Sequence, residues 1–321
     1  MAVPTSQSAA PLVSIGIPTF NRASGLRRAA ASALAQSHRR VEIVISDNGS
    51  SDATAQACRD LTAADPRVRV LSHPVNRGPI ANFNAVIAAM RGEYGLLLAD
   101  DDWLDADYVE RCLTVLRTRP DHALVGGVAR YYDGDDAVRE GRRTNLAQED
   151  PGTRMWRYLR GVDDNGIFYG LARTADLQRA APMPDVLGAD WLLVAALAFS
   201  GKVLTVSETH VYRSLGGTSR SIPRILGTVR RSAAVGRQVP YLVTVGALFQ
   251  EIAWRSAAYA RAAPARRFFL AARVAPAAMR WRGTLWLLWG PSLLRIARRP
   301  RARRLRAPLA SALEQGGDPR R

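Results

Sequence analysis

The sequence predicts an α/β fold with one mostly parallel central sheet flanked by helices. Across the first 130 residues, apolar segments of roughly 4–8 residues, the length of buried strands, alternate with longer helical segments. Polar clusters follow each apolar segment, at the sheet edge where such folds bind ligands. The chain has 321 residues, of which 47% are hydrophobic and 23% charged, so it can bury a large core and is not disordered as a whole.

Four strand–helix pairs account for this alternation. The first strand, 12–18, is apolar and precedes an alanine-rich helix at 22–37. The second, 41–47, is rich in Val and Ile and precedes a helix at 52–64, for which Asp52 is a candidate N-cap. The remaining strands are predicted at 68–71 and 94–99, and the remaining helices at 78–91 and 106–117.

The second half of the chain is less regular. The pattern predicts a strand at 124–132, a polar loop at 133–152, a mixed segment at 156–180, an apolar helix at 187–200 and a strand at 202–206. Residues 208–222 are rich in Ser, Gly and Arg, which is typical of a mobile loop, and 241–275 are predicted to be helical.

Positive charge gathers at the end of the chain. The net charge is +17, and residues 254–321 hold 16 Arg against two acidic residues, a net of +14. Trp, Leu and Arg are mixed at 279–297, and an Arg cluster follows at 298–306. The apolar stretch is shorter than the roughly 20 residues of a transmembrane helix, so we expect 276–306 to contact an anionic membrane peripherally. A packing helix followed by a disordered basic tail is the alternative.

The start of the chain shows no secretory pattern, and Cys58 and Cys112 lie outside any zinc or disulfide pattern. We therefore expect a cytoplasmic protein, with the C-terminus on the inner face of the cell membrane.

Asp100, Asp101 and Asp102 directly follow an apolar strand. Three adjacent carboxylates repel one another unless a cation neutralises them, and Mg²⁺ or Mn²⁺ prefers carboxylate and phosphate oxygens. Asp100 and Asp102, two positions apart, can face one site. Alternatively, Asp102 or Asp105 caps the helix at 106–117.

Asp47 begins a polar turn that runs to Asp52. Its carboxylate could accept hydrogen bonds from a nucleobase or ribose, or the segment could serve only as a turn and helix cap.

Taken in order, the segments 13–22, 45–52, 76–78 and 92–102 resemble the motifs of family 2 glycosyltransferases, over roughly residues 12–215. The resemblance implies a GT-A fold, a nucleotide-diphosphate sugar as donor and a divalent cation, Mn²⁺ or Mg²⁺, as cofactor. The residues implied to bind the nucleotide sugar are Pro18, Thr19, Asn21, Asp47, Arg77, Gly78, Asp100 and Asp101. Asp102 and Asp100 are implied to bind the metal, with His210 as a further ligand, although a lone His is more often structural.

The resemblance also implies an inverting displacement with an aspartate as base. Asp190 matches that position, although Ala189 stands where Glu is common, and the alternative is an acidic residue stabilised by the helix dipole. Asp163 and Asp164 are alternative bases in a segment that resembles an acceptor loop. Arg213 and Arg220 could clamp the diphosphate, or belong to a solvated basic loop.

These expectations divide the chain into a disordered start (1–11), a catalytic domain (12–222) and a helical, Arg-rich extension (223–321). Within the catalytic domain, 12–130 would bind the nucleotide and 131–222 the acceptor. The predicted acceptor is a glycan or lipid-linked precursor in cell-envelope polysaccharide synthesis. Alternatives are a nucleic-acid-binding protein that uses the Arg-rich tail and a nucleotidyltransferase. We expect no specific nucleic-acid partner.

Overall fold

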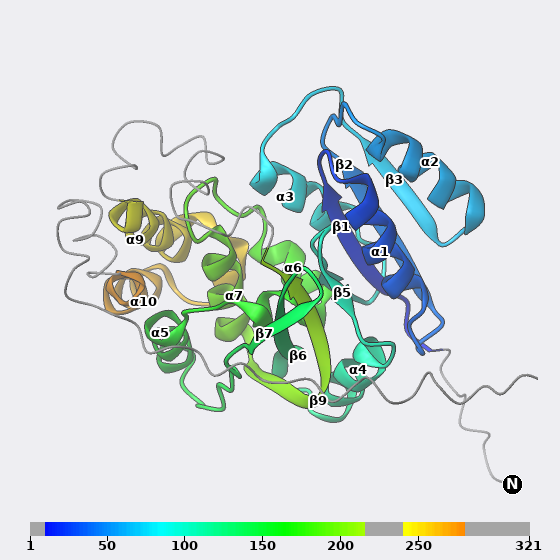
Figure 1. The fold of residues 1–321 in the computed structure, drawn as a ribbon. Helices are drawn as coiled ribbons and strands as arrows, with labels where there is room; N and C mark the ends of the chain where they lie inside the picture. The colour runs from blue at the N-terminus through cyan, green and yellow to red at the C-terminus, as the bar shows by residue number, and fades with distance from the viewer. Residues whose placement is uncertain (1–9, 216–239, 280–321) are drawn as a thin grey trace, which may run out of the picture.

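This computed structural model describes residues 10–215 and 240–279. In these ranges, nine strands form one sheet (Figure 1). The strands are β1 (Val13–Thr19), β2 (Val41–Asp47), β3 (Val68–Ser72), β4 (Tyr94–Leu97), β5 (Trp103–Leu104), β6 (His122–Asp133), β7 (Asp136–Glu140), β8 (Leu171–Arg173) and β9 (Lys202–Ser214). Their order across the sheet is β3-β2-β1-β4-β8-β6-β9-β5, and β7 pairs with β6 outside this order. The predicted α/β fold is therefore confirmed.

The first four strands are all parallel, as predicted. β1 is buried at every residue because it lies between β2 and β4 and has helices on both faces. Pro18 is tolerated in this central strand because β4 pairs with β1 only as far as Gly16. The missing N–H of Pro18 points to the side where that partner has ended, so no ladder hydrogen bond is lost.

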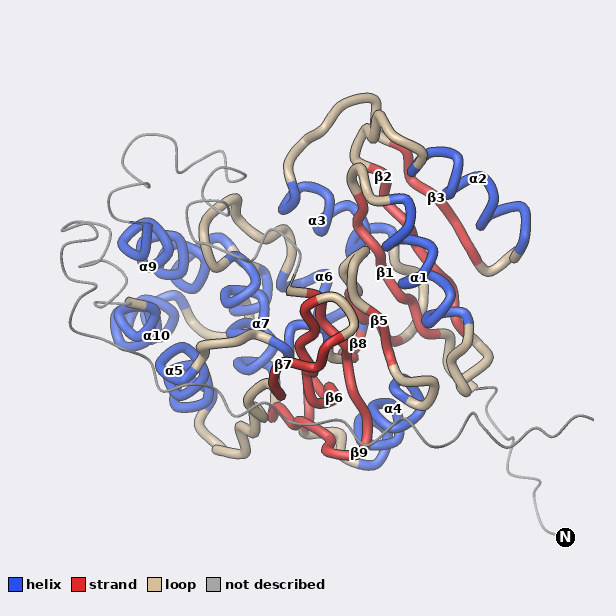
Figure 2. The backbone as a smooth tube through the Cα atoms, viewed as in Figure 1, coloured by secondary structure: helices blue, strands red, loops and turns tan. Residues whose placement is uncertain are grey.

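Helices cover both faces of the sheet (Figure 2). They are α1 (Ala23–Leu34), α2 (Thr54–Ala64), α3 (Pro79–Ala89), α4 (Tyr108–Thr118), α5 (Pro151–Gly161), α6 (Thr174–Ala180), α7 (Ala189–Ser200), α9 (Pro240–Gln250) and α10 (Pro264–Val274). α1, α2 and α4 pack on one face, and α3, α6 and α7 on the other. The predicted helices of the first half are confirmed, with ends within three residues of those predicted.

The second half differs from prediction in two segments. The polar segment 133–152 contains β7, a short strand exposed at every residue that forms a hairpin with β6 through Gly134 (φ 64°). β9 does not end at Val206 but continues to Ser214, because its second half pairs with β6 on one side and β5 on the other. Residues 208–214 are thus a strand rather than a loop, and 216–222 lie outside the described residues.

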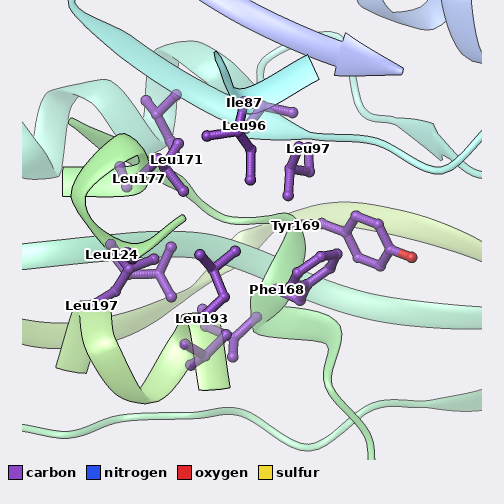
Figure 3. Packing of buried hydrophobic residues seen from close by; sticks show 14 of the residues in the cluster. Ile87, Leu96, Leu97, Leu124, Phe168, Tyr169, Leu171, Leu177, Leu193 and Leu197 are labelled. Carbon is purple, nitrogen blue, oxygen red and sulfur yellow. The ribbon is translucent and has the colours of Figure 1, made fainter. Parts of the chain in front are cut away.

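The core lies between the sheet and the helices (Figure 3). Leu96 and Leu97 of β4 belong to one buried cluster with Ile87 of α3 and with Leu193 and Leu197 of α7. Phe168 and Tyr169 belong to a 3₁₀ turn, Gly166–Tyr169, that fills the space between these groups. This core holds the carboxyl ends of the strands in fixed positions.

α9 and α10 confirm that 241–275 is helical, and they lie beside α5 and α7 (Figure 1). Thr244 Oγ1 donates to Leu187 O at 2.6 Å, and Arg273 Nη1 lies 3.2 Å from Asp150 Oδ2. Among the described helices, none is long and apolar enough to span a bilayer. The predictions for 1–9, 216–239 and 280–321, including Arg220 and nearly all of the interfacial segment, concern residues outside the described ranges.

Candidate active site

Asparagine side chains join the loops that follow β1, β2 and β3. Asn21 N donates to Ser50 Oγ (2.9 Å), and Asn21 Oδ1 accepts from Ser51 N (2.8 Å). Asn21 has φ 50°, a conformation that Asn tolerates better than most residues. Asn48 accepts from Arg77 N (3.0 Å) and donates to Asn76 Oδ1 (2.9 Å). The three loops therefore form one rigid edge, and Asn48 and Asn76 are contributors to it that the sequence analysis did not identify.

The residues predicted to bind the nucleotide lie along this edge. Pro18 and Thr19 end β1, Asp47 ends β2, and Arg77 and Gly78 come directly before α3. Asp47 is 5% exposed, and its Oδ1 accepts from Ser50 N (3.1 Å). It also borders an open pocket of about 410 Å³ between α2 and β3. The sheet topology thus brings together residues that lie up to 60 positions apart.

Asp100 follows β4 and turns toward the end of β1. Thr19 Oγ1 donates to Asp100 Oδ2 (2.8 Å), and Arg22 Nε lies 3.4 Å from Asp100 Oδ1. Burial raises the pKa of Asp100 to about 6, although the hydrogen bond from Thr19 opposes the rise. The neighbouring Asp101 accepts from Arg22 Nη1 (2.8 Å). Arg22 thus holds two of the three carboxylates, a role that its position next to Asn21 did not reveal.

Asp102 is the most buried of the three, with 2% of its surface exposed. Its Oδ1 accepts from Ser214 N (3.0 Å), and its Oδ2 lies 3.5 Å from Arg213 Nε. Burial raises the pKa of Asp102 to about 7, while the positive charge of Arg213 opposes the rise. Neither Asp102 nor Asp105 caps α4, whose N-cap residue, Asp107, makes no side-chain capping bond.

Arg213 is held by two tyrosines. Its Nη1 donates to Tyr131 Oη (3.0 Å) and its Nη2 to Tyr169 Oη (3.3 Å), and the guanidinium carbon lies 5.3 and 4.8 Å from the two ring centroids. Burial raises the pKa of the Tyr169 phenol, and the charges of Asp102 and Asp190 add to the rise. Tyr169 and Arg213 therefore lie within electrostatic reach of both Asp102 and Asp190.

Asp190 lies in the first turn of α7, after Gly188 in a left-handed conformation (φ 75°). Asn165 Nδ2 donates to Asp190 Oδ2 (2.7 Å), and Tyr158 Oη donates to Asn165 Oδ1 (2.7 Å). Burial raises the pKa of Asp190, and the hydrogen bond from Asn165 and the charge of Arg213 oppose the rise. These two hydrogen bonds orient the Asp190 carboxylate, and Asn165 binds its Oδ2 rather than its Oδ1.

The alternative bases are placed differently. Asp164 accepts from Arg142 N (3.0 Å) and Arg139 Nη1 (3.0 Å). Burial alone would raise its pKa, but these hydrogen bonds outweigh that effect and the pKa is lowered. Asp163 is exposed and accepts from the backbone of Asp164 (2.8 Å). Of the three carboxylates, Asp190 has the environment best suited to a base.

His210 lies away from Asp102 along β9. The antiparallel register pairs Trp103 with Tyr212, which sets Asp102 opposite Arg213 and Asp105 opposite His210. His210 Nδ1 lies 2.8 Å from Asp105 Oδ2, whose other oxygen accepts from Tyr212 Oη (2.6 Å). The metal-ligand role of His210 stays a prediction that this arrangement does not favour.

The part of the chain that the structure describes offers few metal ligands. In 10–215 and 240–279, no three His, Cys, Asp or Glu side chains converge on one point. Asp102 Oδ2 has Arg213 as its neighbour, and Asp100 is partly bound by Thr19 and Arg22. One or two carboxylates fit Mg²⁺ or Mn²⁺, because these ions keep waters and bind substrate phosphates in their remaining positions.

The sequence is similar to those of known glycosyltransferases. Residues 14–176 match the sequence profile of the family Glycosyl transferase family 2. The match includes Asp100–Asp102 and ends before Asp190. Chondroitin synthase of Pasteurella multocida is 41% identical over 103 residues, 32% of this chain but only 11% of that protein's length. An uncharacterized glycosyltransferase of Nostoc sp. is 27% identical over 238 residues, covering 69% of this chain and 70% of its own.

Two solved structures share the fold. S. aureus TarS 1–349, in complex with UDP-GlcNAc, has a TM-score of 0.61 and 16% identity, and the match covers 85% of this chain and 74% of TarS. The mannosyltransferase PcManGT from Pyrobaculum calidifontis, in complex with GDP-Man and Mn²⁺, has a TM-score of 0.52 and 17% identity, with coverage of 89% and 81%. The predicted GT-A fold is confirmed.

Proposed function

The chain belongs to glycosyl transferase family 2, and we propose that it moves a sugar from a nucleoside diphosphate to an acceptor hydroxyl by a metal-dependent, inverting displacement. The observation that supports this most directly is the grouping of Asp102, Arg213 and Asp190 beside the loops that follow β1 and β2. A diphosphate needs positive charge, and an acceptor hydroxyl needs a base. Both kinds of group occur at this one edge of the sheet.

In this proposal the nucleoside lies against the edge formed by Pro18, Thr19, Asn21 and Asp47, with Arg77 and Gly78 beside it. The Asp47 carboxylate accepts hydrogen bonds from the base or the ribose. Two nucleotide sugars occur in the structural relatives, UDP-GlcNAc in TarS and GDP-Man in PcManGT, so both are candidate donors.

Asp102 and Asp100 would hold a divalent cation, with Asp101 beside them. When bound, the cation supplies positive charge that stabilises the departing diphosphate. Arg213 would supply a second positive charge on the same side, because the two tyrosines keep its guanidinium next to Asp102. Arg220, and His210 as a further ligand, stay predictions.

Asp190 would act as the base. Its carboxylate takes the proton of the acceptor hydroxyl, and the hydroxyl oxygen forms a bond to the anomeric carbon. The bond from that carbon to the diphosphate oxygen breaks, and the diphosphate leaves with the electron pair on the opposite face. The raised pKa of Asp190 suits this role, because a stronger base accepts the proton more readily.

For the acceptor we propose a glycan or lipid-linked precursor of a cell-envelope polysaccharide, in line with the polysaccharide synthases among the relatives. The catalytic unit would be 12–222, and the Arg-rich extension, 223–321, would place it on the inner face of the cell membrane through 276–306.

A thermal-shift panel of UDP, dTDP, GDP and CDP, each with and without Mn²⁺, tests the donor site. A ligand at 100 times its dissociation constant stabilises the folded state by about 2.7 kcal/mol, which is easily measured. We expect one nucleotide to raise the melting temperature only when Mn²⁺ is present. If no nucleotide at millimolar concentration stabilises the folded protein, the proposed donor site is wrong. That result would favour the alternative of a nucleic-acid-binding protein.

A further inference from the structure

An exposed aromatic surface lies on the helices after residue 240. Trp254 is 57% exposed, Phe268 52% and Phe269 73%. Leu242, in the same region, is 48% exposed, so this region holds four of the eight exposed large hydrophobic side chains in the described ranges. Single exposed apolar side chains are common, but a contiguous group marks an interaction site.

The aromatic rings are contiguous. Phe249 at the end of α9 contacts Trp254 with a centroid distance of 5.7 Å and Phe268 with 5.5 Å, and Phe268 contacts Phe269 at 6.3 Å. Arg267 fixes this arrangement, because its Nε donates to Ile252 O (2.9 Å) and ties α10 to the turn after α9. We call Phe249, Trp254, Phe268 and Phe269 the aromatic face.

Positive charge borders the aromatic face. Arg255 follows Trp254, Arg266 comes two residues before Phe268, and both are exposed. Neither forms an ion pair in the part of the chain that the structure describes. Residues 240–279 carry five Arg and one acidic residue, Glu251. The occupant of this surface must therefore be apolar at its centre and negatively charged around it.

We propose that the aromatic face docks on an anionic lipid bilayer. Exposed Trp and Phe insert at the boundary between headgroups and acyl chains, while adjacent Arg side chains bind lipid phosphates. The chain continues from this surface into 280–306, which holds nine Arg and no acidic residue, so the sequence on the C-terminal side favours the same partner. This contact is distinct from the one expected at 276–306, and it does not depend on sugar transfer.

Vesicle flotation of the full chain tests the proposal, with phosphatidylcholine vesicles that contain or lack phosphatidylglycerol. Wild-type protein should float with the anionic vesicles only. The double variant Trp254→Ser/Phe269→Ser should bind them at least about tenfold more weakly, since two large apolar side chains no longer insert. Arg255→Gln/Arg266→Gln should bind anionic vesicles more weakly than wild type but keep part of the preference for anionic lipid, since the nine Arg of 280–306 remain.

Val138→Ser is the control, because Val138 is 37% exposed on β7, outside the aromatic face. It should bind vesicles as wild type does, and all variants should keep the wild-type melting temperature. Unchanged flotation of the Trp254/Phe269 variant would overturn the proposal, as would equal weakening by Val138→Ser or a wild-type protein that does not bind. A wild-type dimer that the same double variant dissociates would show instead that a second copy occupies this surface.

Discussion

Replacing Asn165 with Ala should raise the pKa of Asp190. The fall in the transfer rate at low pH should then occur at a higher pH than in the wild type. Asn165 Nδ2 lies 2.7 Å from Asp190 Oδ2 and is the side-chain donor that opposes the effect of burial. A hydrogen bond to a charged group is worth about 1.5–3 kcal/mol, and one pKa unit corresponds to about 1.36 kcal/mol. The substitution therefore removes about 1.5–3 kcal/mol of stabilisation from the charged carboxylate, which raises its pKa further.

The direction follows from the role of the base. Asp190 works when it is deprotonated, so the rate falls as the pH drops through its pKa, and a raised pKa moves this fall to higher pH. The rate is measured against pH with the donor that the thermal-shift panel identifies. A ¹³C NMR titration of the Asp190 carboxyl measures the same shift without any substrate.

Tyr158→Phe is the matched comparison. It removes the bond that orients the Asn165 amide (2.7 Å) but keeps the amide itself, so its shift should be in the same direction and smaller. If folded Asn165→Ala has the wild-type NMR midpoint, the contact does not tune Asp190. If the NMR midpoint moves but the dependence of the transfer rate on pH does not, Asp190 is not the base. The proposed mechanism then fails, although the effect of Asn165 on the Asp190 pKa is confirmed.

Further predictions concern the site and the core. Asp190→Asn should lower transfer by about 10²–10⁴-fold and leave the nucleotide thermal shift intact; normal transfer would move the base elsewhere. Asp102→Asn should abolish the Mn²⁺-dependent part of that shift with an unchanged circular dichroism spectrum, and a persisting Mn²⁺ effect would remove Asp102 from the metal site. Gly49→Ala should cost about 1–2 kcal/mol in urea unfolding, because φ is 73° and a Cβ would lie 2.8 Å from the Val75 carbonyl carbon; unchanged stability would contradict the strain. Leu96→Ala, at a fully buried position, should cost about 2–5 kcal/mol in the same assay, and a loss below 1 kcal/mol would mean that the core refills.

The sequence predicted the first half of the fold well because three of its strands, β1, β2 and β4, are buried on both faces. Such strands are continuous apolar segments, and a local pattern is enough to find them. β7 was missed because all five of its residues are exposed and its two apolar residues, Ala137 and Val138, are adjacent rather than alternating. The end of β9 was missed because Glu208–Ser214 forms a strand only through pairing with β6 and β5.

The sequence by itself determined which residue types the site contains and their order along the chain, through the motifs around Asp47 and Asp100–Asp102. Only the tertiary structure decided which of them meet. Asp102 and Ser214 are 112 positions apart and are joined by the pairing of β5 with β9, and Asn165 reaches Asp190 because the 3₁₀ turn packs against α7. No local pattern carries this information, because strand register and helix packing are set by the burial of the whole core.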